Sequence, residues 1–235
     1  DGIELHGPSA ELEKCKGVFD AFGTTYWAVD SGLTFMSKEV GSVRAAQTIM
    51  TIQPTFTIKD WEAARPVMDK FVELTKSETG CVYYGWTKVG DKLFCREAYG
   101  EATGVLAHID NVGATFGAFL ESGAATLDKI ELHGPKEELE KCKATMDRFG
   151  TTYWAVDSGF SCMSKEVGSV RSAQTLMSIQ PTFTIKDWAA AEPIMAEFVE
   201  ATKTETGCIY YGWTRVDNKL FCREAYVDAK AVQAH

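Results

Sequence analysis

The stretch that decides the fold is "CVYYGWTKVGDKLFCREAY" at 81–99, because it contains two candidate strands joined by a tight turn. Both arms are rich in β-branched and aromatic residues, which favours strands. Gly90 and Asp91 separate the arms, and a two-residue glycine–aspartate loop is typical of a β-hairpin. The sequence therefore predicts a hairpin over 81–99.

The turn also sets which residues of the hairpin share a face, because successive side chains of a strand point to opposite sides. The opposed pairs expected on one face are Trp86 with Cys95, Tyr84 with Glu97, and Val82 with Tyr99. The residues expected on the other face are Tyr83, Gly85, Phe94 and Arg96.

The hairpin occurs twice. "CIYYGWTRVDNKLFCREAY" at 208–226 repeats it at an offset of 127 residues (208 − 81), with Asp217-Asn218 as the turn. The same offset relates "IELHGP" at 3–8 to 130–135 and "GTTYWAVDSG" at 23–32 to 150–159. A fixed offset over most of the chain indicates a recent tandem duplication.

One period of the repeat contains alternating strand and helix patterns. We expect strands at 48–58, 126–133 and 151–159 beside the hairpin, and helices at 59–80, 102–122 and 134–150. Asp60 is the expected N-cap of the first helix and Gly80 its end. The order is β-α-β-β-α-β-α-β.

The repeat is cut out of phase, so the chain holds one complete unit and two partial ones. The complete unit is expected at 46–160. The segments 1–45 and 161–235 are complementary parts of a second unit that is circularly permuted and incomplete. They could pair with each other, or with neighbouring molecules head to tail.

Composition narrows the function classes. The net charge of −9 and the isoelectric point near 5.0 argue against nucleic acid or an anionic membrane as partner. No apolar run approaches the roughly 18–20 residues of a membrane span. The seven cysteines form no CxxC pair and no zinc-ligand spacing, so we expect no metal and buried reduced thiols. A reducing compartment, such as cytoplasm or organelle stroma, is favoured.

These motifs resemble those of the antibiotic biosynthesis monooxygenase family. The hairpin that ends in "CREAY" and the helix with "GVLAHIDNVGATF" carry the resemblance, and "IELHGPKEELEKCK" is similar to a C-terminal extension in one subgroup. The resemblance implies an α+β fold built from ferredoxin-like repeats. Two such units join their sheets into the α+β barrel that dimers of the family form, so this chain would be a tandem pseudo-dimer. It also implies oxidation of quinol-type aromatics by O₂ without a cofactor.

His108 is the leading catalytic candidate. The resemblance places a pocket histidine on the helix after the hairpin, and Asn111 lies three residues further on. An oxygenase without a cofactor needs a base to form an electron-rich anion and donors to stabilise that anion. We assign His108 as base and Asn111 or Arg96 as stabiliser. The alternative is that His108 has a structural role at a barrel end.

Aromatic and basic residues of the two hairpins are candidates for a substrate pocket. The candidates are Trp86, Tyr84, Tyr83, Trp213, Tyr211, Arg223 and His235. The alternative for the aromatic residues is an ordinary core position. If Arg96 and Arg223 point inward, they would attract anionic substrates. The alternative is that they form salt bridges at an interface.

Two further pairs of equivalent residues in the repeats are weaker candidates for a functional site. His6 and His133 precede helix N-termini, where a capping or loop role is expected. Gln53 and Gln180 stand where haem-degrading relatives use asparagine, which weakens a haem-cleaving interpretation.

Three functions stay open from the sequence. The first is a cofactor-independent oxygenase that acts on a small aromatic molecule. The second is a non-catalytic assembly protein that self-associates, supported by near-identical repeats. The third is a carrier that binds a hydrophobic ligand or pigment without turnover.

Overall fold

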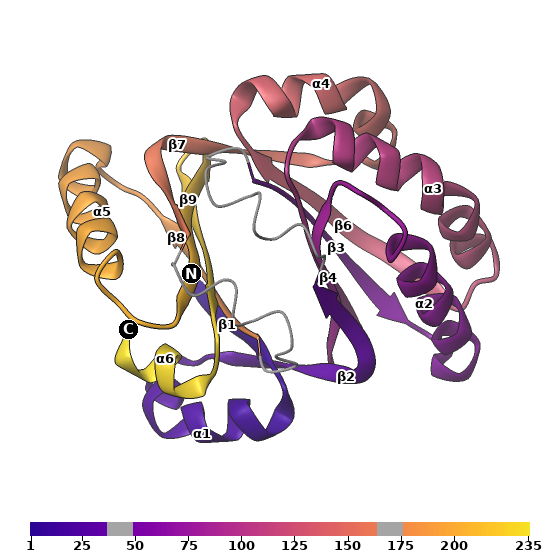
Figure 1. Cartoon of the computed structure of the whole chain (residues 1–235), viewed down its shortest axis with the longest axis horizontal. Coiled ribbons are helices and arrows are strands. Elements are labelled where there is room, and N and C mark those ends of the chain that lie inside the picture. Colours follow the sequence, from indigo (N-terminus) through magenta and orange to yellow (C-terminus); the bar gives the residue numbers. More distant parts are fainter. Residues whose placement is uncertain (37–48, 164–175) are drawn as a thin grey trace. The chain divides into compact units, whose positions relative to one another are not determined.

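The computed structural model describes residues 1–36, 49–163 and 176–235 (Figure 1). The chain divides into two compact units. Unit 1 comprises Asp1–Ala28 and Ala155–His235, and unit 2 comprises Val29–Trp154. The domain boundary expected at 45/46 lies outside the described residues. The boundary expected at 160/161 falls inside a strand, and the observed division comes earlier, after Trp154.

Unit 2 contains the sheet and helices of one complete period. Its elements are β3 (Met50–Ile58), α2 (Trp61–Thr75), β4 (Cys81–Val89), β5 (Lys92–Tyr99), α3 (Ala102–Glu121), β6 (Ala125–Gly134), α4 (Lys136–Met146) and the 3₁₀ helix η3 (Asp147–Phe149). The order β-α-β-β-α-β agrees with the pattern expected from the sequence.

Unit 1 is assembled from both ends of the chain. Its elements are β1 (Gly2–Gly7), α1 (Ser9–Phe19), the 3₁₀ helix η1 (Asp20–Phe22), β8 (Met177–Thr184), α5 (Trp188–Thr202), β9 (Cys208–Val216), β10 (Lys219–Tyr226) and α6 (Ala229–Ala234). β1 pairs antiparallel with β8, with Ile3 opposite Pro181. The first and last segments therefore share one sheet.

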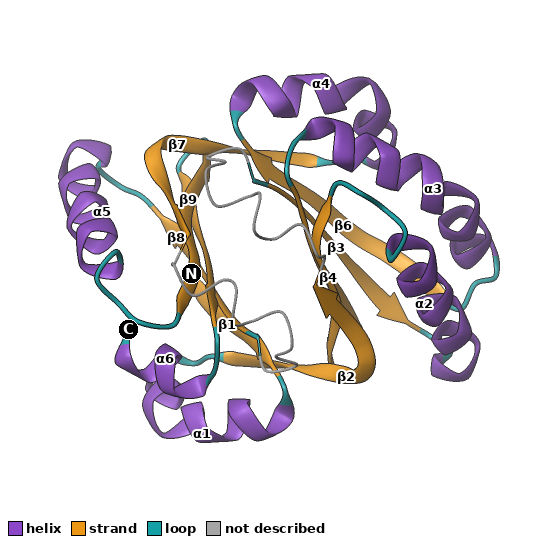
Figure 2. Ribbon diagram, viewed as in Figure 1, coloured by secondary structure: helices purple, strands orange, loops and turns teal. Residues whose placement is uncertain are grey.

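Two long strands, β2 (Thr25–Met36) and β7 (Thr152–Met163), begin in one unit and end in the other. Hydrogen-bonded pairing follows the order β1-β2-β4-β5-β3-β6-β7-β9-β10-β8 and closes between β8 and β1. The expected α+β barrel topology is thus confirmed. Figure 2 shows the strands and helices of each unit by type.

The hairpin register is confirmed at two of its three predicted pairs. Tyr84 lies opposite Glu97 and Trp86 opposite Cys95. The third pair is wrong, because the register shifts between Cys81 and Tyr83 and Cys81 faces Tyr99 instead. Val82 is the extra residue of this β-bulge.

Helix α2 begins as predicted and ends early. The Asp60 side chain accepts hydrogen bonds from the backbone N–H of Glu62 and Ala63. The helix ends at Thr75 and not at Gly80. The Thr75 and Ser77 hydroxyls donate to carbonyl oxygens of the last turn, and such side-chain bonds compete with continued helix.

Aromatic rings form the centre of the unit 2 core, between the sheet and helices α2 and α3. The Phe71 ring of α2 lies 5.9 Å from Trp86. The Phe119 ring of α3 lies 5.9 Å from Phe56 and 6.4 Å from Phe71. Both helices cover the same face of the β3–β4–β6 region (Figure 1).

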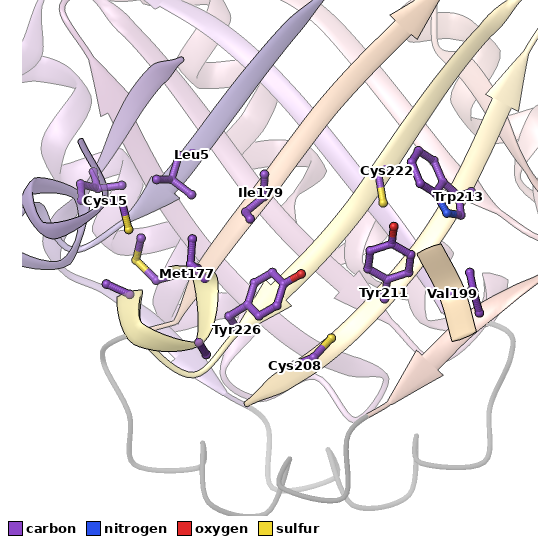
Figure 3. Close-up of a cluster of buried hydrophobic side chains, with 14 of the residues drawn as sticks. Leu5, Cys15, Met177, Ile179, Val199, Cys208, Tyr211, Trp213, Cys222 and Tyr226 are labelled. Atoms are coloured by element: carbon purple, nitrogen blue, oxygen red, sulfur yellow. The ribbon is translucent and has the colours of Figure 1, made fainter. Parts of the chain in front are cut away.

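Unit 1 buries a corresponding cluster (Figure 3). The residues labelled there include Leu5 of β1, Ile179 of β8, and Tyr211 and Trp213 of β9. The cluster joins side chains from both ends of the chain, so its burial holds these two segments together.

The cysteines with described side chains are buried free thiols: Cys15, Cys81, Cys95, Cys142, Cys208 and Cys222. This confirms the expectation for these residues, while Cys162 lies outside the described side chains. Of the helices formed by the described residues, none has the length and apolar character needed to cross a membrane.

Candidate functional site

His108 lies on the buried face of α3, with 3% of its surface exposed. Val105 and Val112, one turn before and one turn after it, are buried on the same face. The Tyr84 and Tyr99 rings lie 5.7 and 5.3 Å from the imidazole. The helix therefore holds the histidine between aromatic rings at the sheet.

Both nitrogens of the His108 ring face carboxylates. Nδ1 lies 3.0 and 3.1 Å from the two carboxylate oxygens of Glu78. Nε2 lies 3.2 Å from Oε2 of Glu97. The Tyr99 hydroxyl donates to the same Glu97 oxygen at 2.7 Å. These four side chains form a buried acid–base cluster, which we call the His108 cluster.

Glu78 was not identified from the sequence, which predicted helix up to Gly80. Because α2 ends at Thr75, the following turn brings Glu78 against α3. The sequence offered one sign that Glu78 matters: the second repeat also has a glutamate, Glu205, at the equivalent position. Glu97 appeared only as a hairpin neighbour of Tyr84, and the structure adds it to the site.

Asn111 anchors the cluster through Glu78. Its Nδ2 donates to Oε1 of Glu78 at 2.7 Å and to the Leu74 carbonyl at 3.0 Å. Its side chain is exposed, and it is not among the residues that line the pocket described below. Its geometry thus suits orientation of Glu78 better than the anion-stabilising role expected from the sequence.

Burial and charge act in opposite directions on the cluster. Burial lowers the pKa of His108, but the Glu97 and Glu78 carboxylates together raise it above its usual value. Burial raises the pKa of Glu97, and His108 and the Tyr99 hydroxyl offset part of that rise. Each group of the His108–Glu97 pair therefore holds a proton more tightly than it would in water.

His108 and Glu97 of the cluster line an apolar cavity of about 40 Å³ in unit 2. The lining residues are Ile52, Pro54, Phe56, Phe71, Tyr84, Trp86, Glu97, His108, Ile109, Val112, Gly113, Phe116, Ile130 and Phe149. A single water needs roughly 10–15 Å³, so the enclosed space takes about three water-sized groups, and an aromatic molecule would extend beyond it. Tyr84 and Trp86 are among these lining residues.

Arg96 and Tyr83 lie on the other face of the sheet. The Arg96 Nη2 donates to the Tyr83 hydroxyl at 2.8 Å, and the guanidinium lies 5.3 Å from the Tyr83 ring centre. Neither residue lines the pocket. Arg96 therefore does not lie beside His108, because alternation along β5 turns it away from Glu97.

Unit 1 repeats the cluster around His235. Its Nδ1 lies 3.0 and 3.1 Å from the Glu205 oxygens, and Nε2 lies 3.3 Å from Glu224. The Tyr226 hydroxyl donates to Glu224 at 2.7 Å. The His235 side chain is 19% exposed, against 4% for His108. The His235 cluster therefore has the same geometry as the His108 cluster, but its histidine is more exposed to solvent.

The other candidates of unit 1 divide between the two faces in the same way. The Tyr211 ring lies 5.7 Å from His235 and 5.8 Å from Trp213. Arg223 donates to the Tyr210 hydroxyl at 2.6 Å, so it repeats the pairing of Arg96 with Tyr83. Arg223 is therefore not part of the His235 group.

His6 and His133 do not cap the helices that follow them. Each is fully buried, and each stacks on a tryptophan, Trp27 and Trp154 respectively, with ring centres 5.4 Å apart. Neither helix start has a side-chain cap. Within residues 1–36, 49–163 and 176–235, no three His, Cys, Asp or Glu side chains are placed to hold a metal ion.

The fold is shared with the structure of one protein described as a monooxygenase. A proposed monooxygenase (FN1347) from Fusobacterium nucleatum superposes with a TM-score of 0.52 over 80% of both chains, at 13% identity. This likeness shows the fold alone. A second, from Lactobacillus acidophilus, covers 80% of this chain and 81% of its own, with a TM-score of 0.46 and 14% identity.

MupZ from Pseudomonas fluorescens is 30% identical over 48% of this chain and 93% of its own, with a TM-score of 0.45. No protein-family model matches the chain, and no curated protein sequence matches it.

Proposed function

We propose that unit 2 is a cofactor-independent oxygenase that acts on a small quinol-type aromatic molecule. The observation that carries the proposal is that the His108–Glu97 pair lines an apolar pocket. Such a pocket excludes water, which strengthens the charge interactions inside it. The shared fold and the resemblance of the "CREAY" and "GVLAHIDNVGATF" motifs support the reaction class.

The His108–Glu97 pair would accept the proton of the substrate hydroxyl. The aromatic anion then transfers one electron to O₂, and the substrate radical and superoxide combine to form a carbon–oxygen bond. The pair returns the proton to the peroxide, which gives a hydroperoxide. The oxygenated carbon then loses its own hydrogen as a proton while the O–O bond breaks, and the departing hydroxide takes up that proton and leaves as water, so that a C=O group remains. Two hydrogens of the substrate and one oxygen atom make the water, so no external reductant is needed.

The other residues of the site would orient this pair. Glu78 fixes the Nδ1 side of the ring, and Asn111 fixes Glu78. Tyr84 and Trp86 would supply the walls against which an aromatic ring packs.

The test is O₂ consumption with anthrone as the probe, with quinone and peroxide yields measured together. His108→Gln should lower the rate roughly 100-fold or more, as expected for loss of a proton acceptor. His235→Gln, the matched change in unit 1, should leave most of the rate. A wild-type rate no higher than that of free anthrone in buffer would refute the proposal.

A carrier of a hydrophobic molecule is the second candidate. The observation that favours it is that both ring nitrogens of His108 are already held by carboxylates, and that His235 repeats this arrangement outside the unit 2 pocket. The same cluster in both units suits a structural role for the two histidines, and the pocket would then bind a molecule without converting it. Tight binding of anthrone without O₂ consumption would identify the carrier.

A further inference from the structure

Helix α3 contains two kinds of glycine. Gly104 is required by packing, because a Cβ atom there would lie 3.2 Å from the Gly80 carbonyl oxygen and 3.3 Å from its Cα. The two backbones approach so closely that neither position has room for a side chain. Gly104 thus has a structural explanation.

Gly113 has no such explanation. It lies in the interior of a 20-residue helix, where glycine is less favourable than alanine. A Cβ atom there would meet no atom within 4 Å. Gly113 also lines the pocket, whose walls are otherwise formed mostly by large side chains.

We propose that Gly113 determines the size of the aromatic molecule that the pocket accepts. This inference rests on the proposed function, because it takes the pocket to be the substrate site. Ile109, Gly113 and Phe116 lie at i, i+4 and i+7 on α3, so they line the pocket from one helix face. The absent side chain leaves a gap in that face, and a second ring or a ring substituent occupies it.

The direction of helical side chains supports this assignment. A side chain at position 113 would lean back over the preceding turn, toward Ile109. That is the turn that carries His108. A ring whose hydroxyl meets the His108–Glu97 pair would therefore extend along the helix past Gly113, and a large residue there would block it.

Gly117 provides a matched control on the same helix. It too would place a Cβ atom in open space, and its backbone is also helical. It does not line the pocket. Leucine at either position should raise helix stability alike, because both lose a glycine. Only leucine at 113 should change binding.

The experiment compares calorimetric binding of phenol and 1-naphthol to wild type, Gly113→Leu and Gly117→Leu. Gly113→Leu should weaken 1-naphthol binding roughly tenfold or more, and phenol binding less than about threefold. Gly117→Leu should change neither affinity by more than about threefold. Melting curves check folding, and Gly113→Ala serves if Gly113→Leu does not fold.

The outcomes separate the two proposals. An unchanged ratio of naphthol to phenol affinity in Gly113→Leu, or an equal change in Gly117→Leu, would overturn the role of Gly113. Failure of both probes to bind the wild type would overturn the proposed function, and the inference with it. Size selection at Gly113 without O₂ consumption would support the inference and leave the protein a carrier.

Discussion

Glu78 holds the Nδ1 side of His108 at 3.0 and 3.1 Å, and Glu205 holds His235 at the same two distances. In both units the glutamate comes from the turn after a helix that ends in threonine. Both units therefore contain the same acid–base cluster, although of its members the sequence analysis singled out only the histidines as site residues.

Glu78→Gln should lower the pKa of His108. The Glu78 carboxylate favours the charged imidazolium, and a neutral amide removes that charge while keeping the size of the side chain. The measurement is an NMR titration of the His108 ring. Glu205→Gln, the same change in unit 1, should leave the His108 titration in place. An unchanged His108 pKa in Glu78→Gln would show that Glu97 alone sets it.

Tyr99→Phe should raise the pKa of Glu97 further. The Tyr99 hydroxyl stabilises the ionised carboxylate by a 2.7 Å hydrogen bond, and phenylalanine cannot donate. Infrared spectra recorded across a pH series report the protonated carboxyl group directly. We also expect a loss of roughly 1.5–3 kcal/mol in unfolding free energy at neutral pH, typical of a buried hydrogen bond to a charged group. A Glu97 band that titrates as in wild type would contradict this.

The stability of the protein should fall as pH rises through the titration of the His108 cluster. His108 and Glu97 both have raised pKa values in the folded state, so the folded protein holds protons that the unfolded chain releases. The stabilisation is complete below the ordinary values, 4.5 for Glu97 and 6.5 for His108. It is lost as pH rises through the folded values. Urea unfolding from pH 5 upward measures it.

His108→Gln is the variant that isolates this effect. Removal of the imidazole abolishes the part of the pH dependence that begins near 6.5, so the unfolding free energy should change less above that pH. A pH profile parallel to that of the wild type would assign the slope to other groups.

The hairpin and the repeat made the fold predictable, because alternation and turn chemistry act over a few neighbouring residues. The pairings of Tyr84 with Glu97 and Trp86 with Cys95 followed from the turn alone. The bulge at Val82 did not, because one extra residue in a strand has no marked signal in a run of apolar residues.

The site was only half predictable for a related reason. The helix pattern and the resemblance together identified His108, which lies on the buried face of α3. Its partner Glu78 depends on where α2 ends, and helix ends are the least certain part of a sequence pattern. A boundary that differs by five positions, at Thr75 and not Gly80, decides whether that carboxylate reaches the imidazole.

Phe71→Ala should destabilise the protein far more than Phe198→Ala, although the two residues are repeat equivalents beside Trp86 and Trp213. Phe71 is 2% exposed because the Phe119 ring of α3 lies against it, whereas Phe198 is 49% exposed. Truncation of a fully buried phenylalanine costs about 3–5 kcal/mol, because it removes apolar contacts and leaves a cavity.

The loss at Phe198 should be about 1–2 kcal/mol, since roughly half of its ring already contacts water and truncation there leaves no closed cavity. Urea unfolding monitored by tryptophan fluorescence gives both values under one condition. Equal losses would mean that Phe198 is covered in solution by contacts that a single chain does not make. The comparison thus tests the open state of unit 1 as well as the packing of unit 2.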